Sequence, residues 1–122
     1  MTKVVFFKSN GVFWGFEEQG HSGFASSGED ILCSAISAMT MLVINAIEVA
    51  YSSEANYDID EETANVRLAA PGALPNLEKD EKKRYAISGL IMAYYYQLND
   101  LVEEYYDYLE VEVIEKEYEG NK

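Results

Sequence analysis

The segment from Ile31 to Tyr51 has only one charged residue, Glu48, in 21 residues, so most of it has to be shielded from water. A helix of this length could span a lipid bilayer. Several polar residues interrupt the segment, however, and its acidic flanks contain no Lys or Arg to orient a membrane helix. The pattern therefore favours a core helix of a protein that does not contact a membrane.

Two capping patterns, Ser26 with Glu29 and Ser27 with Asp30, precede this segment. They predict that the helix begins near residues 26–30. A helix that is apolar on more than one face lies between two layers or in a subunit interface. The apolar residues fall on two such faces, one with Ile31, Ala35, Ala38 and Leu42, and the other with Leu32, Ile36, Met39 and Val43.

The sequence before this helix predicts a β-hairpin. Residues 3–7 and 12–16 are rich in β-branched and aromatic residues, which favour strands. Asn10 and Gly11 lie between them, and both tolerate the positive φ angles of a type I′ turn. We therefore expect two antiparallel strands joined by this turn.

The sequence after the helix predicts two short strands, a second helix and a last strand. The expected ranges are 56–60, 63–68, 80–106 and 109–113, the last one alternating apolar and polar residues. The resulting order, ββαββαβ, predicts one α+β domain over residues 1–122, with two helices packed on a mostly antiparallel sheet.

Composition excludes several classes of function. The chain has 22 Asp and Glu against 9 Lys and Arg, a net charge of −13, which argues against direct binding to nucleic acid. One Cys and one His cannot supply a zinc site, and one Cys forms no intramolecular disulfide. No apolar run follows a basic start at the N-terminus, so we expect no signal peptide. The sequence predicts a cytoplasmic protein without a metal or cofactor.

His21 and Cys33, each unique in the chain, lie on either side of a loop rich in Gly and Ser. An imidazole close to a thiol can take its proton and leave the nucleophilic thiolate. Asp30 and Ser37 lie three residues before and four after Cys33, on the same helical face. Asp30 could orient the imidazole, and Ser37 could bind the thiolate or the substrate. Alternatively, Cys33 is a core residue, His21 a surface residue and Asp30 a helix cap.

The helix start affects the chemistry available at Cys33. If Glu29 caps the helix, the Cys33 N–H has no intrahelical partner and could bind an oxyanion. If Ser27 caps it, that N–H is already bonded within the helix. The sequence leaves both open, and the loop is another source of oxyanion donors.

These residues resemble the signature of the ribosomal-processing cysteine proteases called Prp. The similar order of elements and chain length extend the resemblance over the whole chain, although Ser22 and Ser34 stand where the family commonly has Ala. The resemblance implies a cytoplasmic homodimer that removes a short N-terminal extension, next to an aromatic residue, from the large-subunit ribosomal protein numbered twenty-seven. It implies that His21 and Cys33 are the catalytic pair and that Asp30 and Ser37 support them. The matching residues are Gly20, His21, Gly28, Asp30, Ile31, Cys33, Ile36 and Ser37.

Two hypotheses follow. In the first, the protein is a cysteine endopeptidase with no cofactor, and the Gly/Ser loop is a lid in which Phe24 contacts an aromatic substrate side chain or packs on the domain. In the second, it is a non-enzymatic acidic dimer that binds a basic protein. The C-terminal acidic residues either steer a basic partner or only solvate a strand. The lid and substrate-contact residues in the first hypothesis are Gly20, Ser22, Gly23, Phe24 and Gly28.

Overall fold

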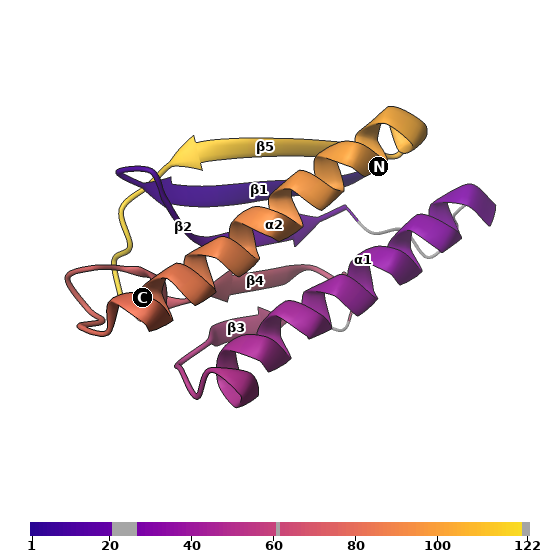
Figure 1. Ribbon diagram of the computed structural model, residues 1–122. Helices are drawn as coiled ribbons and strands as arrows, with labels where there is room; N and C mark the ends of the chain where they lie inside the picture. The colour runs from indigo at the N-terminus through magenta and orange to yellow at the C-terminus, as the bar shows by residue number, and fades with distance from the viewer. Residues whose placement is uncertain (21–26, 61, 121–122) are drawn as a thin grey trace.

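A computed structural model describes residues 1–20, 27–60 and 62–120 of the chain. Two helices cover one face of a five-stranded sheet with the order β3-β4-β2-β1-β5 (Figure 1). All neighbouring strands are antiparallel except the parallel pair β1 and β5. This arrangement confirms the predicted α+β class and order. The elements are β1 (Thr2–Ser9), β2 (Val12–Gln19), α1 (Ser27–Asn45), β3 (Asn56–Ile59), β4 (Val66–Ala69), α2 (Glu81–Tyr105) and β5 (Leu109–Glu115).

The predicted hairpin is confirmed as β1 and β2. Its two-residue turn has φ angles of 51° at Asn10 and 81° at Gly11, as a type I′ turn requires. Farther along β2, Gly15 lies so close to β4 that a Cβ atom there would collide with the carbonyl oxygen of Leu68. The absence of a side chain at Gly15 therefore lets β4 pair with β2.

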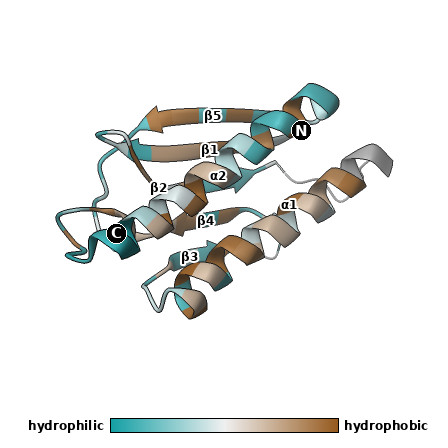
Figure 2. Ribbon diagram, viewed as in Figure 1, coloured by the Kyte–Doolittle hydropathy of each residue, from teal (hydrophilic) through white to brown (hydrophobic). Residues whose placement is uncertain are grey.

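The helix α1 packs on the sheet with one apolar face and leaves the other exposed. Its inner face includes Leu32, Ile36 and Val43, none more than 2% exposed. On the outer face, Ile31 and Leu42 are each 62% exposed. No second layer of described residues covers this face, so α1 does not lie between two layers in the part of the chain that the structure describes. In Figure 2, α1 is brown along much of its length, whereas α2 is mixed and teal at its ends.

The stretch Ile31–Ala50, which includes a π-helical turn at Ala46–Ala50, is long and apolar enough to cross a membrane by length and composition. In this structure 33% of it is buried within the protein. The burial comes from the inner face, because that face packs on the sheet.

The helix α2 begins as the sequence predicts. The Asp80 side chain caps it by accepting a hydrogen bond from the backbone N–H of Lys82 at 3.0 Å. Leu90 and Leu101, at helical spacing with the core residues of α2, are only half-buried. The fully buried ones are Ile87, Ile91, Tyr94 and Leu98.

The strand β4 begins three residues later than predicted, at Val66 instead of residue 63. The reason is the turn that precedes it. Asp60 Oδ1 accepts a hydrogen bond from the N–H of Glu62 at 3.0 Å, and Thr63 Oγ1 accepts one from the N–H of Asn65 at 3.2 Å. Polar side chains near residue 63 therefore bond to the backbone of the turn and not to a neighbouring strand.

Candidate active site

Cys33 lies near the N-terminal end of α1 with a half-buried, free thiol. Its Sγ atom is 4.0 Å from the hydroxyl oxygen of Thr2, a fully buried residue at the start of β1. The backbone N–H of Thr2 bonds to the carbonyl oxygen of Tyr108 at 2.7 Å. The sulfur is therefore held against the rigid end of the sheet where β1 begins.

The helix start excludes one source of oxyanion stabilisation. Because α1 already includes Ser27, Cys33 is its seventh residue. Only the first four N–H groups of a helix lack an intrahelical acceptor, so the N–H of Cys33 is bonded within the helix. The alternative with Glu29 as the cap is wrong, so this N–H is not available to bind an oxyanion.

The first two residues of the chain lie between the end of β2 and Cys33. Gly20 has a φ angle of 87° and packs on the backbone of Met1, whose carbonyl oxygen a Cβ at residue 20 would hit. Thr2, the next residue, contacts Cys33. Gly20, directly before His21 in the sequence, is therefore anchored beside the residues that touch the sulfur.

Several predicted site residues lie outside the described residues: His21, Ser22, Gly23 and Phe24, together with the side chain of Asp30. Ser37 is exposed one turn after Cys33. Since α1 is continuous, positions 30, 33 and 37 share a helical face, as expected. Gly28 belongs to the first turn of α1, so the Gly/Ser loop ends before Ser27 and not at Gly28.

A second polar group lies under α1, and the sequence analysis missed it. Thr40 Oγ1 and Tyr94 OH both donate hydrogen bonds to Glu18 Oε1, at 2.6 and 2.8 Å. Glu18 is 1% exposed, and this burial raises its pKa to about 7, although both hydrogen bonds favour the ionised form. The alternation of side chains along β2 indicates that Glu18 is buried, because Glu18 follows Phe16 by two residues and so shares its buried face.

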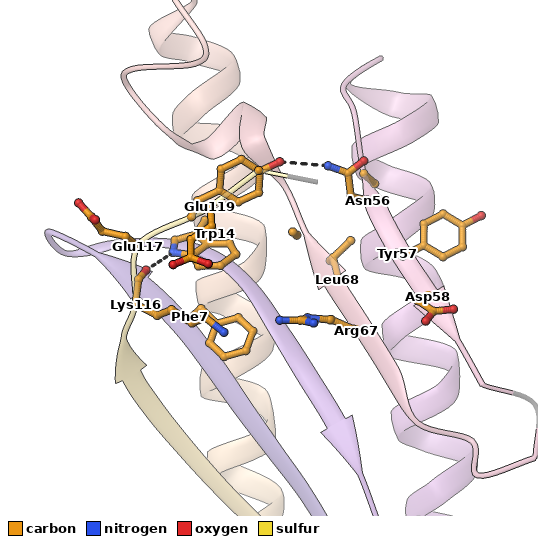
Figure 3. Close-up of a pocket in the computed structure, with 14 residues that line it drawn as sticks. Phe7, Trp14, Asn56, Tyr57, Asp58, Arg67, Leu68, Lys116, Glu117 and Glu119 are labelled. Atoms are coloured by element: carbon orange, nitrogen blue, oxygen red, sulfur yellow. Dashed lines mark hydrogen bonds between the residues drawn. The ribbon is translucent and has the colours of Figure 1, made fainter. Parts of the chain in front are cut away.

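The opposite face of the sheet has a pocket of about 400 Å³ without a thiol or imidazole among the residues that line it (Figure 3). Phe7 and Trp14 stack at 5.2 Å in it, and Lys116 Nζ lies 4.8 Å from the Phe7 ring centroid. Because Cys33 contacts the other side of the sheet, this pocket is not part of the thiol site. Among the described residues, no three His, Cys, Asp or Glu side chains are arranged to hold a metal ion.

Comparison with known proteins identifies the family of this chain. The model of the family "Cysteine protease Prp" matches residues 1–110. The ribosomal processing cysteine protease Prp of Bacillus subtilis (strain 168) is 30% identical over 106 residues, which cover 87% of this chain and 79% of that protein.

Solved structures share the fold. A crystal structure from Streptococcus mutans matches with a TM-score of 0.77 and 23% identity, covering 95% of this chain and 99% of the other. The protease Prp from S. aureus, crystallised with a substrate peptide, matches with a TM-score of 0.77 and 16% identity, covering 93% and 100%. With the family model matching most of the sequence, this chain belongs to the Prp family of cysteine proteases.

Proposed function

We propose that this cysteine protease removes the short N-terminal extension of the large-subunit ribosomal protein numbered twenty-seven. The B. subtilis relative is named a ribosomal processing protease, and the S. aureus Prp was crystallised with a substrate peptide. The observation that carries the proposal is the family match over residues 1–110, which include the free thiol of Cys33. Family membership also favours the protease over the non-enzymatic binding module.

In the proposed mechanism, His21 takes the proton of Cys33 and the thiolate attacks the scissile carbonyl carbon. The tetrahedral intermediate collapses as the imidazolium protonates the leaving amine, and an acyl-enzyme remains. Water, deprotonated by His21, then releases the new carboxylate and the free thiol. Asp30 orients the imidazole, and Ser37, exposed one turn after Cys33, contacts the substrate or the sulfur.

The proposal includes a lid formed by the Gly/Ser loop, from Gly20 to the residue before α1. Its glycine and serine content is the supporting observation. Closure over a bound peptide completes the site only when the substrate is present, which protects other proteins from cleavage. Within the loop, Phe24 is the large apolar side chain for an aromatic substrate residue.

Charge supports a basic substrate in the cytoplasm. The net charge of −13 attracts cationic proteins and repels RNA. The region from Asp100 to Lys122 has nine acidic and two basic residues and adds a local charge of −7. A protease with this negative charge can bind a free ribosomal protein without adhering to ribosomal RNA.

The proposed enzyme is a homodimer. The supporting observation is the outer face of α1, where large apolar side chains are exposed to solvent. A monomer rarely leaves such a continuous face uncovered. The exposed residues are Ile31 (62%), Met41 (43%), Leu42 (62%) and Val49 (75%).

Mass spectrometry of a peptide spanning the extension junction tests the function. We expect wild-type protein to cut the peptide once, and Cys33→Ala and His21→Ala to leave it intact. Ser34→Ala is the matched control, because Ser34 is exposed next to Cys33 and has no catalytic role in the mechanism. Cleavage by Cys33→Ala at the wild-type rate would refute the proposal.

A further inference from the structure

Three polar or charged side chains are buried among the described residues, and all three contribute to contacts between the sheet and α1: Thr2, Glu18 and Thr40. Thr2 on β1 touches Cys33, and Glu18 on β2 accepts a hydrogen bond from Thr40. Within the part of the chain that the structure describes, α1 is thus joined to the sheet by two polar contacts in an otherwise apolar interface.

The two contacts lie on one face of α1. Cys33 and Thr40 are seven residues apart, or about two turns and 10 Å along the helix axis. Their partners lie on neighbouring strands, because Val4 of β1 pairs with Glu18 of β2. Apolar contacts are not directional, whereas hydrogen bonds are. Two directional contacts two turns apart restrict both the translation of α1 along the sheet and its rotation.

Glu18 is a costly residue at this position. Its neighbours in the sheet are Val4 on β1 and Val66 on β4, so an apolar side chain would suit the site. No ion pair of Glu18 is present among the described residues, and a buried carboxyl without a cation destabilises the fold. A buried carboxyl at a position that suits an apolar side chain indicates a role in function.

Burial favours a protonated Glu18, although two hydroxyls donate to its Oε1 atom. Besides the two hydrogen bonds to Glu18, the hydroxyl oxygens of Thr40 and Tyr94 lie 3.0 Å apart, and the carbonyl oxygen of Ile36 is 3.5 Å from the Tyr94 hydroxyl. The two hydroxyls can donate both of their protons to Glu18 Oε1, which favours the ionised form. The cost of burying a charge without a cation outweighs these two hydrogen bonds, so the carboxyl holds its proton more tightly than an exposed one.

We propose that Glu18, through its hydrogen bond to Thr40, is a positioning residue that fixes where α1 lies along the sheet. It thereby holds Cys33 beside the end of β2, in the position from which its thiolate attacks. The inference rests on the proposed role of Cys33 as nucleophile. Glu18 belongs to the strand that ends at Gly20, directly before His21. The cluster therefore connects the helix that carries the thiol to the strand that leads to the imidazole.

The protonation of Glu18 makes this positioning dependent on pH. The groups that face its carboxyl are Val4 on β1, Val66 on β4, Thr40 on α1 and Tyr94 on α2. Tyr94 is the titratable one, and burial raises its pKa far above the usual range, so it stays protonated. Burial raises the pKa of Glu18 to about 7, which lies between pH 6 and pH 8, the two values at which cleavage is compared below. Above this pH the cluster contains an unpaired buried charge.

Cleavage by Thr40 variants tests the positioning role. Thr40→Val keeps the shape of the side chain and removes its hydrogen bond to Glu18 and its contact with the Tyr94 hydroxyl. We expect kcat to fall about tenfold or more with little change in KM, because misplacing a nucleophile slows the chemical step. Thr40→Ser restores the hydroxyl and should recover most of kcat. The control, Val43→Ala, removes buried volume from the same helix without removing a polar group of the cluster. A kcat for Thr40→Val equal to that of folded Val43→Ala would overturn the proposal.

A second variant tests the dependence on pH. Glu18→Gln remains neutral and can both donate and accept hydrogen bonds. We expect the ratio of wild-type to variant kcat to fall about threefold or more between pH 6 and pH 8. A constant ratio would refute the pH dependence.

Alkylation of Cys33 by iodoacetamide separates this proposal from the proposed function, since it needs no peptide substrate. If the wild type fails to cut the peptide, the proposed function is wrong, and the alkylation rate still reports on positioning. Thr40→Val should then lower the rate at pH 6.5 toward that of a free thiol. An alkylation rate unchanged from the wild type would overturn the inference.

Discussion

The helices α1 and α2 cover the same face of one sheet, but they distribute polar groups in opposite ways (Figure 1). The outer face of α2 is largely polar, and a side chain caps its N-terminus. On α1, large apolar residues such as Leu42 are exposed, whereas Cys33 and Thr40 make polar contacts with the sheet.

This difference separates a helix whose residues, apart from Tyr94, only stabilise the fold from one organised for function. The pattern of α2 is that of an ordinary surface helix, with apolar residues inward and polar residues outward. The inward polar contacts of α1 position its thiol, and its outward apolar residues suit a subunit interface. We therefore expect substitutions in α2, other than at Tyr94 in the Glu18 cluster, to change stability alone, and substitutions in α1 to change catalysis or assembly as well.

The largest expected effects come from the inner faces. Ile36→Ala in α1 and Ile91→Ala in α2 each truncate a side chain with 0% exposure, and each should lower the free energy of unfolding by about 2–5 kcal/mol. Urea denaturation measures both. At a temperature where both variants are folded, we expect Ile36→Ala to lower kcat more, because it lies one turn from Cys33. An equal loss of kcat in Ile91→Ala would contradict the division between the helices.

The pH dependence of stability should reveal the cluster that joins the two helices. The pKa of Glu18 rises from an ordinary 4.5 to about 7 on folding, so the folded state binds its proton more tightly. This contribution is complete below pH 4.5 and is lost as the pH rises through 7. The stability of the wild type relative to Glu18→Gln should therefore fall by about 3 kcal/mol between pH 4.5 and 8. Parallel stability curves from urea titrations would show that Glu18 does not titrate as described.

Local patterns in the sequence were sufficient for the fold. The turn at Asn10 and Gly11 and the 3.6-residue periods of the helices depend on neighbouring residues, and both appear in the structure. The strand β4 was misplaced because Thr63, a good strand residue, bonds to the turn instead.

The site was less predictable because its contacts join distant parts of the chain. Cys33 stood out by being unique, but Thr2 lies 31 residues away in the sequence and Tyr94 lies 76 residues from Glu18. Alternation along β2 indicates that Glu18 faces the core, yet no sequence pattern indicates which hydroxyls meet it. Such partners are fixed only when the helices pack on the sheet.

A charge introduced on the outer face of α1 should weaken the proposed dimer, whereas one on the outer face of α2 should not. Leu42→Glu places a charge in the proposed dimer surface, and it should raise the dimer dissociation constant at least about tenfold, equivalent to roughly 1.4 kcal/mol. The control is Tyr85→Glu, at a residue 70% exposed on α2, which should leave the dimer intact. Sedimentation analysis measures both. A monomeric wild type, or equal weakening by both variants, would exclude this face as the interface.

The smallest expected effect lies at the cap of α2. Asp80→Ala removes the hydrogen bond to the N–H of Lys82, which measures 3.0 Å, and should lower the free energy of unfolding by about 1 kcal/mol. Asp80→Asn keeps an acceptor oxygen and should recover most of this loss in thermal denaturation. Because the cap is not part of the Glu18 cluster, kcat of the folded variant should equal that of the wild type. A lower kcat at full folding would mean that α2 also controls the position of Cys33, and that the two helices do not divide stability and catalysis between them.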